Sequence, residues 1–147
     1  MFSQRVRDVM ERKKLLTAAP EITVREAVKL MAKRNVGAVM VVGDGKLVGI
    51  FTERDAVSRV LARDRDARTT RLADVMTAKP MTVSPGKSFG YALLMMHDHG
   101  FRHVPVIDDG KLVGMVSARN ALDPDLEEFV AESSRRDQIL RERAETA

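Results

Sequence analysis

The segment Asp44-Gly45-Lys46-Leu47-Val48-Gly49 recurs letter for letter as residues 109–114, an offset of 65 residues. The same offset aligns residues 17–57 with residues 82–122 and gives 14 identities in 41 positions, whereas unrelated sequences share about two or three by chance. Self-similarity at a fixed spacing indicates a tandem duplication. The chain is therefore predicted to hold two copies of one folding unit, followed by an extension from Asp123 onward.

Within each copy the residue pattern predicts the element order β-α-β-β-α. The repeated Asp-Gly pair lies between two short apolar runs, which is typical of a tight β-hairpin turn. The predicted strands are residues 16–18, 38–42 and 47–51 in the first copy, and 81–83, 104–107 and 112–116 in the second. A further helix is expected to begin near Glu53 and near Ala118.

The longer helix in each copy has a recognisable start, buried face and stop. Thr23 and Glu26 have the spacing of a capping box, and Ser88 holds the equivalent place in the second copy. The residues expected on the buried faces are Ala27, Leu30 and Met31, and Ala92, Met95 and Met96. Asn35 and Gly100 follow the helices, and both residue types tolerate the left-handed conformation of a helix stop.

One unit of this size buries too little apolar surface to be stable alone. Two units are expected to pack sheet to sheet about a pseudo-two-fold axis, leaving two related clefts as natural ligand sites. The predicted fold is α+β, tandem β-α-β-β-α repeats with a C-terminal helix. The expected divisions are repeat 1 at 5–61, a linker at 62–71, repeat 2 at 72–122 and a helical extension at 123–147.

Charge is spread unevenly along the 147 residues, whose net charge is +4. The extension from Asp123 holds eight acids and four bases, so it contributes −4 and the first 122 residues carry +8. A basic body suits an anionic ligand, phosphate in particular, and it equally suits plain solubility. Around the linker, Arg59, Arg63, Arg65 and Arg68 interleave with acids, a pattern typical of a solvated segment.

Composition excludes several classes of function. The absence of cysteine excludes disulfides and thiolate metal sites. No apolar run approaches the roughly 18 residues of a membrane span. The charged N-terminus is also unlike a signal peptide. A cytoplasmic protein without membrane contact is therefore expected. Few aromatic residues and no long basic run argue against nucleic-acid binding. His97 and His99 point to different faces of a helix, so no metal site is expected, and no catalytic arrangement or catalytic cofactor is indicated.

Both copies share the signature Gly-x-x-(Ser/Thr)-x-x-(Asp/Asn), present as Gly49-Ile50-Phe51-Thr52-Glu53-Arg54-Asp55 and Gly114-Met115-Val116-Ser117-Ala118-Arg119-Asn120. The signature lies where a strand ends and a helix begins, and free backbone N–H groups there favour anions. The hydroxyl of Thr52 or Ser117 can donate to a phosphate oxygen. The side-chain oxygen of Asp55 or Asn120 can accept from ribose hydroxyls.

The remaining signature residues allow two interpretations. Gly49 and Gly114 permit close approach of a ligand or of another backbone. Arg54 and Arg119 can pair with phosphate if their side chains turn inward. The alternative is structural, because Thr-x-x-Asp is also close to a capping box that simply starts a helix.

The repeat length, the element order, the Asp-Gly hairpin and the doubled signature resemble a CBS-domain pair, named for cystathionine β-synthase, over about residues 5–122. Residues 100–108, Gly-Phe-Arg-His-Val-Pro-Val-Ile-Asp, are typical of that family. The first copy departs there, with residues 37–40 reading Gly-Ala-Val-Met and no proline. The resemblance implies that each cleft takes its ribose and phosphate residues from one repeat and most of its adenine pocket from the other.

Carried over residue by residue, the resemblance implies two ligand sites. The first is expected to comprise Gly49, Ile50, Thr52, Arg54, Asp55, Lys79, Pro80, Met81, Thr82, Arg102, His103 and Pro105. The second is expected to comprise Met115, Ser117, Arg119, Asn120, Leu16, Thr17, Ala18, Gly37 and Ala38. The first is expected to bind phosphate better, because it has a carboxylate and also receives Arg102 and His103.

The resemblance implies a stand-alone regulatory module that senses energy or metabolite state by binding AMP, ADP, ATP, NAD or S-adenosylmethionine. Its output is expected through its oligomeric state or through an effector protein in trans, and the family usually forms a two-fold homodimer. The alternative is a ligand-free interaction module that acts through the C-terminal helix. The small apolar faces of that helix, Leu126, Phe129 and Val130, then Ile139 and Leu140, are expected to pack across the body or a partner chain.

Overall fold

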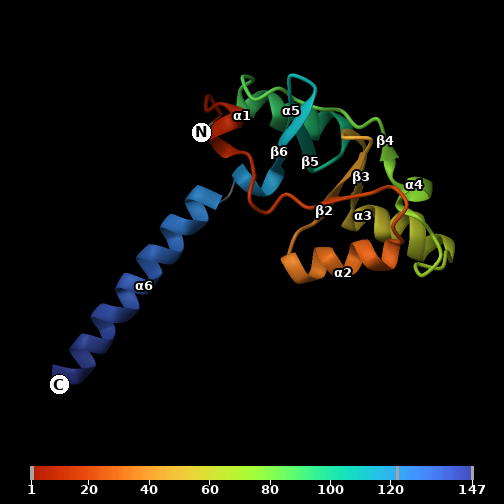
Figure 1. Ribbon diagram of the computed structural model, residues 1–147. Helices are drawn as coiled ribbons and strands as arrows, with labels where there is room; N and C mark the ends of the chain where they lie inside the picture. Colours follow the sequence, from red (N-terminus) through yellow and green to blue (C-terminus); the bar gives the residue numbers. More distant parts are fainter. Residues whose placement is uncertain (1, 122, 147) are drawn as a thin grey trace.

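The computed structural model describes the backbone of residues 2–121 and 123–146, with side chains at 2–121 and 132–145. The strands are β1 (Thr17–Ala18), β2 (Ala38–Gly43), β3 (Lys46–Thr52), β4 (Thr77–Ala78), β5 (His103–Asp108) and β6 (Lys111–Ser117). The helices are α1 (Val6–Val9), α2 (Val24–Arg34), α3 (Glu53–Asp55), α4 (Leu72–Val75), α5 (Phe89–His99) and α6 (Asp123–Thr146) (Figure 1). Shorter turns are the π-helical η1 (Ala56–Val60) and the 3-10 turns η2 (Leu61–Arg63) and η3 (Ala118–Ala121).

Two sheets of related topology form the centre of the fold. The first has the order β1-β2-β3-β4, with β1 parallel to β2 and the other pairs antiparallel. The second has β5 antiparallel to β6, extended by a parallel bridge from Val83 to Val106 and an antiparallel bridge from Glu11 to Met115. This arrangement confirms the predicted α+β fold with repeated β-α-β-β-α units.

The turn and helix-end residues behave as the sequence predicts. Asp44 and Asp109 both have φ of 51°, and the glycine after each also has positive φ, which is the conformation of a type I′ hairpin turn. Asn35 and Gly100 end α2 and α5 with φ of 53° and 73°. At the other end of α2, the Thr23 side chain accepts a hydrogen bond from the backbone N–H of the third helical residue.

The buried face of α2 differs from the prediction at one position. Ala27 and Met31 are buried, but Leu30 is 37% exposed. Val24, at the first helical position, is also buried. With 100° between successive residues, the stripe Val24, Ala27 and Met31 is centred well away from Leu30. The predicted core residues Ala92 and Met96 of α5 are buried, and Met95 is partly buried against the same core.

The two hydrophobic cores exchange their first short helices. Phe51 is fully buried in the first core, which also contains Leu72 and Val75 of α4, although α4 lies at the start of the predicted second repeat. Phe89 is fully buried in the second core, which contains Val6 of α1 from the start of the chain. Each core is therefore completed by the short helix at the start of the other repeat.

A third apolar layer joins the two sheets. Ala38, Met40 and Ile50 of the first sheet form a buried cluster with Met115 of the second. Strands β3 and β6 contact each other across this layer. The predicted sheet-to-sheet packing of the two repeats is present, and it places both signatures at the junction between them.

The C-terminal helix α6 runs away from the two sheets in Figure 1. Residues 132–145 are exposed, including Ile139 at 56% and Leu140 at 60%. The expectation that this stretch packs across the body was wrong, because its sequence offers few apolar side chains among many charged ones. Packing against a partner chain stays a prediction. The other expected apolar face, Leu126, Phe129 and Val130, lies outside the described side chains. No helix in the described part of the chain is long and apolar enough to cross a membrane.

Candidate functional site

The first signature forms a complete capping box. The backbone N–H of Thr52 donates to Asp55 Oδ2 at 2.9 Å, and the Thr52 hydroxyl donates to the same oxygen at 3.1 Å. The Asp55 N–H donates back to Thr52 Oγ1 at 3.3 Å. The structural interpretation of the signature is thus realised, and the carboxylate is held in one fixed orientation.

The second carboxylate oxygen of Asp55 has a different environment. Asp55 is 8% exposed, and Oδ1 lies 3.6 Å from Nε of Arg59. This distance is that of an ion pair and is too long for a hydrogen bond. Because the cap uses Oδ2, Oδ1 is the carboxylate oxygen whose lone pairs can accept a further hydrogen bond.

The second signature repeats this geometry with a neutral side chain. The backbone N–H of Ser117 donates to Asn120 Oδ1 at 2.8 Å, and the Ser117 hydroxyl donates to it at 3.2 Å. Asn120 has one oxygen, which the cap occupies, so its amide group presents N–H donors in place of a second acceptor. The two signatures therefore differ in what they offer a ligand.

Residues from both repeats meet at the first signature. Arg54 Nη1 donates to the carbonyl of Gly100 at 2.6 Å, so the signature helix is tied to the C-terminal end of α5. A cation at a helix C-terminus is favourable because of the helix dipole. A Cβ on Gly37 would lie 3.4 Å from both Glu53 Oε1 and His103 Nε2, so these two side chains border the same glycine.

His103 has an unusual electrostatic environment at this junction. Its pKa is lowered, chiefly because burial disfavours the charged imidazolium. Arg102 also lowers the pKa, while Glu53 and Asp55 act in the opposite direction. With its pKa below the ordinary value of 6.5, His103 is neutral at pH 7 and can both donate and accept a hydrogen bond.

The remaining residues predicted for the first site lie along β3, β4 and the chain that follows. Gly49 and Ile50 pair with β4, and a Cβ on Gly49 would lie 3.0 Å from the carbonyl of Thr77. The backbone N–H of Lys79 donates to the carbonyl of Val48 at 3.1 Å. Lys79, Met81 and Thr82 are exposed, Pro80 is half-buried, and Pro105 is buried opposite Met115.

The residues predicted for the second site are less closely gathered. Met115 and Ala38 meet in the apolar layer, and Leu16 is buried in the first core. Gly37 accepts a hydrogen bond from the Glu53 N–H at 3.0 Å, which places it beside the first signature. Arg119 and Thr17 are exposed, and Ala18 is half-buried.

Sequence reasoning missed Arg59 and Glu53. The sequence pattern places Arg59 in a solvated run of charges, yet in the structure it is anchored to Asp55 and to the backbone at the end of α4. The sequence signal that could have found Arg59 is its spacing from Asp55, because a residue four positions later lies on the same helical face. Glu53 gave no signal of its own, since its approach to His103 depends on how the repeats pack.

Comparison with known proteins identifies the family. The CBS domain pattern matches residues 6–62 and 72–125. The chain belongs to the CBS-domain family. Two CBS domains cover most of it, and proteins of this kind are typically non-catalytic regulatory modules. Among the described residues, no group of three or more His, Cys, Asp or Glu side chains is placed to hold a metal ion.

Curated relatives carry the same domains. The chain is 42% identical over 100 residues to the mitochondrial CBS domain-containing protein CBSX3 of Arabidopsis thaliana, covering 65% of this chain and 48% of that protein. It is 37% identical over 112 residues to the CBS domain-containing protein YhcV of Bacillus subtilis, covering 76% of this chain and 79% of that protein. The chain thus spans about half of the first relative.

Solved CBS structures superimpose closely. The CBS pair of protein MJ0100, in complex with 5′-methylthioadenosine and S-adenosyl-L-methionine, gives a TM-score of 0.75 at 26% identity over 85% of this chain and 98% of that one. Protein PAE2072 of Pyrobaculum aerophilum, complexed with AMP, gives a TM-score of 0.72 at 27% identity, covering 79% of this chain and 88% of that one. A hexameric cyanobacterial CBS-CP12 protein gives a TM-score of 0.76 at 26% identity, covering 83% of this chain and 68% of that one.

Proposed function

We propose that this CBS pair is a regulatory module that binds an adenosyl ligand at the first signature and reports energy or metabolite state. The observation that carries the proposal is the fixed carboxylate of Asp55, whose Oδ1 is turned toward Arg59 while Oδ2 is held by the cap. A buried, oriented carboxylate oxygen is suited to accept from ribose hydroxyls. Solved relatives with adenosyl compounds bound, AMP in one and S-adenosyl-L-methionine in another, support this ligand class.

Arg54 provides a means of coupling ligand charge to the packing of the repeats. Its guanidinium donates to Gly100 at the end of α5. A phosphate at the first signature offers this guanidinium a stronger, charge-assisted acceptor than a carbonyl. We infer that a phosphate-bearing ligand draws Arg54 away from α5 and so alters the connection between the repeats, because a ligand shifts an equilibrium by its differential affinity for the two states.

The test of this function is mass spectrometry of small molecules released from freshly purified, denatured protein, followed by calorimetric titration of the compound found. We expect an adenosyl compound that binds with a defined stoichiometry. If nothing is released and AMP, ATP, NAD and S-adenosylmethionine all fail to bind, the signature serves only as a helix cap. The interaction module acting through α6 would then replace the sensor.

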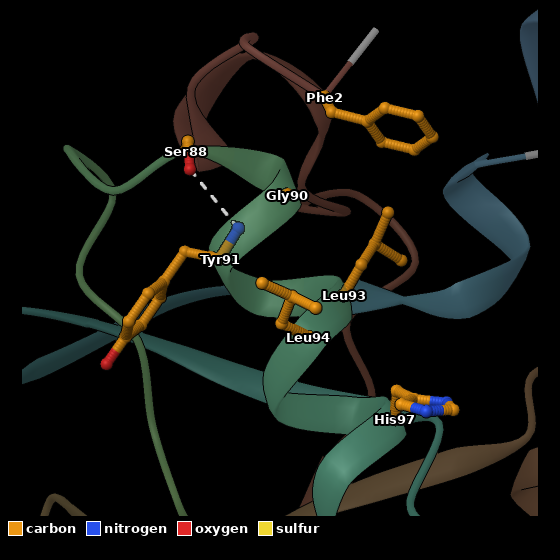
Figure 2. Close-up of a pocket in the computed structure, with 7 residues that line it drawn as sticks. All are labelled: Phe2, Ser88, Gly90, Tyr91, Leu93, Leu94 and His97. Atoms are coloured by element: carbon orange, nitrogen blue, oxygen red, sulfur yellow. Dashed lines mark hydrogen bonds between the residues drawn. The ribbon is translucent and has the colours of Figure 1, made fainter.

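We further propose that the chain forms a homodimer through the outer face of α5. An apolar groove of about 660 Å³ is lined by Phe2 and by residues of α5 that include Tyr91, Leu94 and His97. Figure 2 shows these side chains along α5. Leu94 is 63% exposed and Phe2 is 62% exposed. A contiguous exposed apolar patch marks an interaction surface, and a structural relative is hexameric.

Leu94→Glu is expected to convert the dimer to a monomer, because it places a charge in the apolar groove of each copy. Sedimentation velocity measures the change directly. Leu61→Glu is the matched control, since Leu61 is 69% exposed but lies in η2, outside the groove. A dimer that survives Leu94→Glu and dissociates with Leu61→Glu would assign the interface to another face.

A further inference from the structure

Arg59 connects two parts of the molecule that are far apart in sequence. Its Nε faces Asp55 Oδ1 at 3.6 Å. Its Nη1 donates to the carbonyls of Val75 and Met76 at 3.2 Å and 3.0 Å. One guanidinium thus joins the carboxylate of the first signature to the C-terminal end of α4.

The position of Arg59 in the chain sets up this bridge. It lies in η1, a π-helical turn that directly follows Asp55, and such turns are frequent at functional sites. Its side chain is 40% exposed, so it lies at the edge of the site and not in the core. The planar fork of arginine allows Nε and Nη1 to face different partners at the same time, which a lysine ammonium cannot do in the same way.

The other end of the bridge lies near the start of the second repeat. The carbonyls that Arg59 binds belong to residues just before β4, and β4 pairs with Gly49 and Ile50 of the signature strand. Arg59 therefore connects the Asp55 carboxylate by direct contacts to the chain that enters β4.

The residue that corresponds to Arg59 in the second repeat cannot form this bridge. At the repeat offset of 65 residues, Arg59 corresponds to Pro124 and Asp55 to Asn120. Neither residue carries a charge, and proline has no side-chain donor. The bridge is thus a property of the first signature.

We propose that Arg59 is a positioning residue that holds Asp55 Oδ1 in place for the ribose hydroxyls of the ligand and links that site to the inter-repeat segment before β4. This inference rests on the proposed function for its ligand. The link between Asp55 and the segment before β4 does not depend on the ligand, because it is made by the contacts of Arg59.

The test is calorimetric titration of the full chain with AMP and with 2′,3′-dideoxy-AMP, which lacks both ribose hydroxyls. Arg59→Met keeps the aliphatic stem and removes the charge and donors, and Arg63→Met, four residues later, is the matched control. We expect Arg59→Met to weaken AMP binding about fivefold, as befits a partly exposed ion pair, and to leave dideoxy-AMP binding unchanged. Equal weakening of both ligands, or none, would overturn the positioning role.

A second measurement separates this inference from the proposed function. Amide hydrogen exchange on the ligand-free chain is expected to become faster in Arg59→Met at Thr52, at Asp55 and at residues 76–79, and to stay unchanged in Arg63→Met. If the wild-type chain binds neither nucleotide, the proposed function fails. Hydrogen exchange then tests by itself whether Arg59 links Asp55 to the segment before β4. Unchanged exchange at both ends of the bridge in Arg59→Met would overturn it.

Discussion

Leu72→Ala is expected to lower the free energy of unfolding by about 2 to 5 kcal/mol, the range for removing a fully buried leucine from a close-packed core. Leu72 is 0% exposed in the first core, although it lies at the start of the second repeat in sequence. Because each core is completed by a helix from the other half of the chain, the loss should destabilise the whole pair. Urea unfolding followed by circular dichroism measures it, and we expect one cooperative transition at a lower midpoint.

Leu61→Ala is the matched control for this prediction. Leu61 precedes the same inter-repeat segment but is 69% exposed, and substitutions at such surface positions change stability by about 0.5 kcal/mol or less. A Leu72→Ala variant no less stable than Leu61→Ala would show that α4 does not complete the first core. Two separate transitions would show that the repeats unfold independently.

Much of the fold could be predicted because the duplication supplies each local signal twice. The paired Asp-Gly turns, the Thr23 cap and the stops at Asn35 and Gly100 are local features whose backbone conformations follow from residue type. The exchange of α1 and α4 could not be predicted in this way. Each is a helix of four residues, too short to show a periodic pattern, and its place depends on which core it meets after the chain folds.

The candidate site also combines a feature that local sequence indicates with contacts that it does not. The Thr52–Asp55 geometry follows from a three-residue spacing, so the sequence offers the capping box as one of its two interpretations. The contact of Arg54 with Gly100 and the approach of His103 to Glu53 cross the junction between repeats, and no local pattern specifies them. The sequence allows Arg54 to pair with phosphate if its side chain turns inward, whereas in the structure its guanidinium contacts the carbonyl at the end of α5.

Asp55→Ala is expected to weaken nucleotide binding about tenfold to a hundredfold, because hydrogen bonds to a charged acceptor contribute about 1.5 to 3 kcal/mol. The substitution also removes the oxygen that caps the Thr52 N–H, which costs about 1 kcal/mol of stability. The variant should therefore stay folded at 25 °C. Thermal unfolding checks this before binding is measured.

Asn120→Ala is the control for Asp55→Ala, since it removes the equivalent cap from the second signature. It should reduce stability by a similar amount and leave high-affinity binding at the first signature intact. A matched loss of affinity in both variants would mean that the change reflects general destabilisation.

The most direct test of an adenosyl site at the first signature is calorimetric titration of AMP into the wild-type chain, Asp55→Ala and Asn120→Ala under one set of conditions. We expect tight binding by the wild-type chain and by Asn120→Ala, and binding at least tenfold weaker by Asp55→Ala. Equal affinity of Asp55→Ala and the wild-type chain would contradict the assignment of the adenosyl site to the first signature.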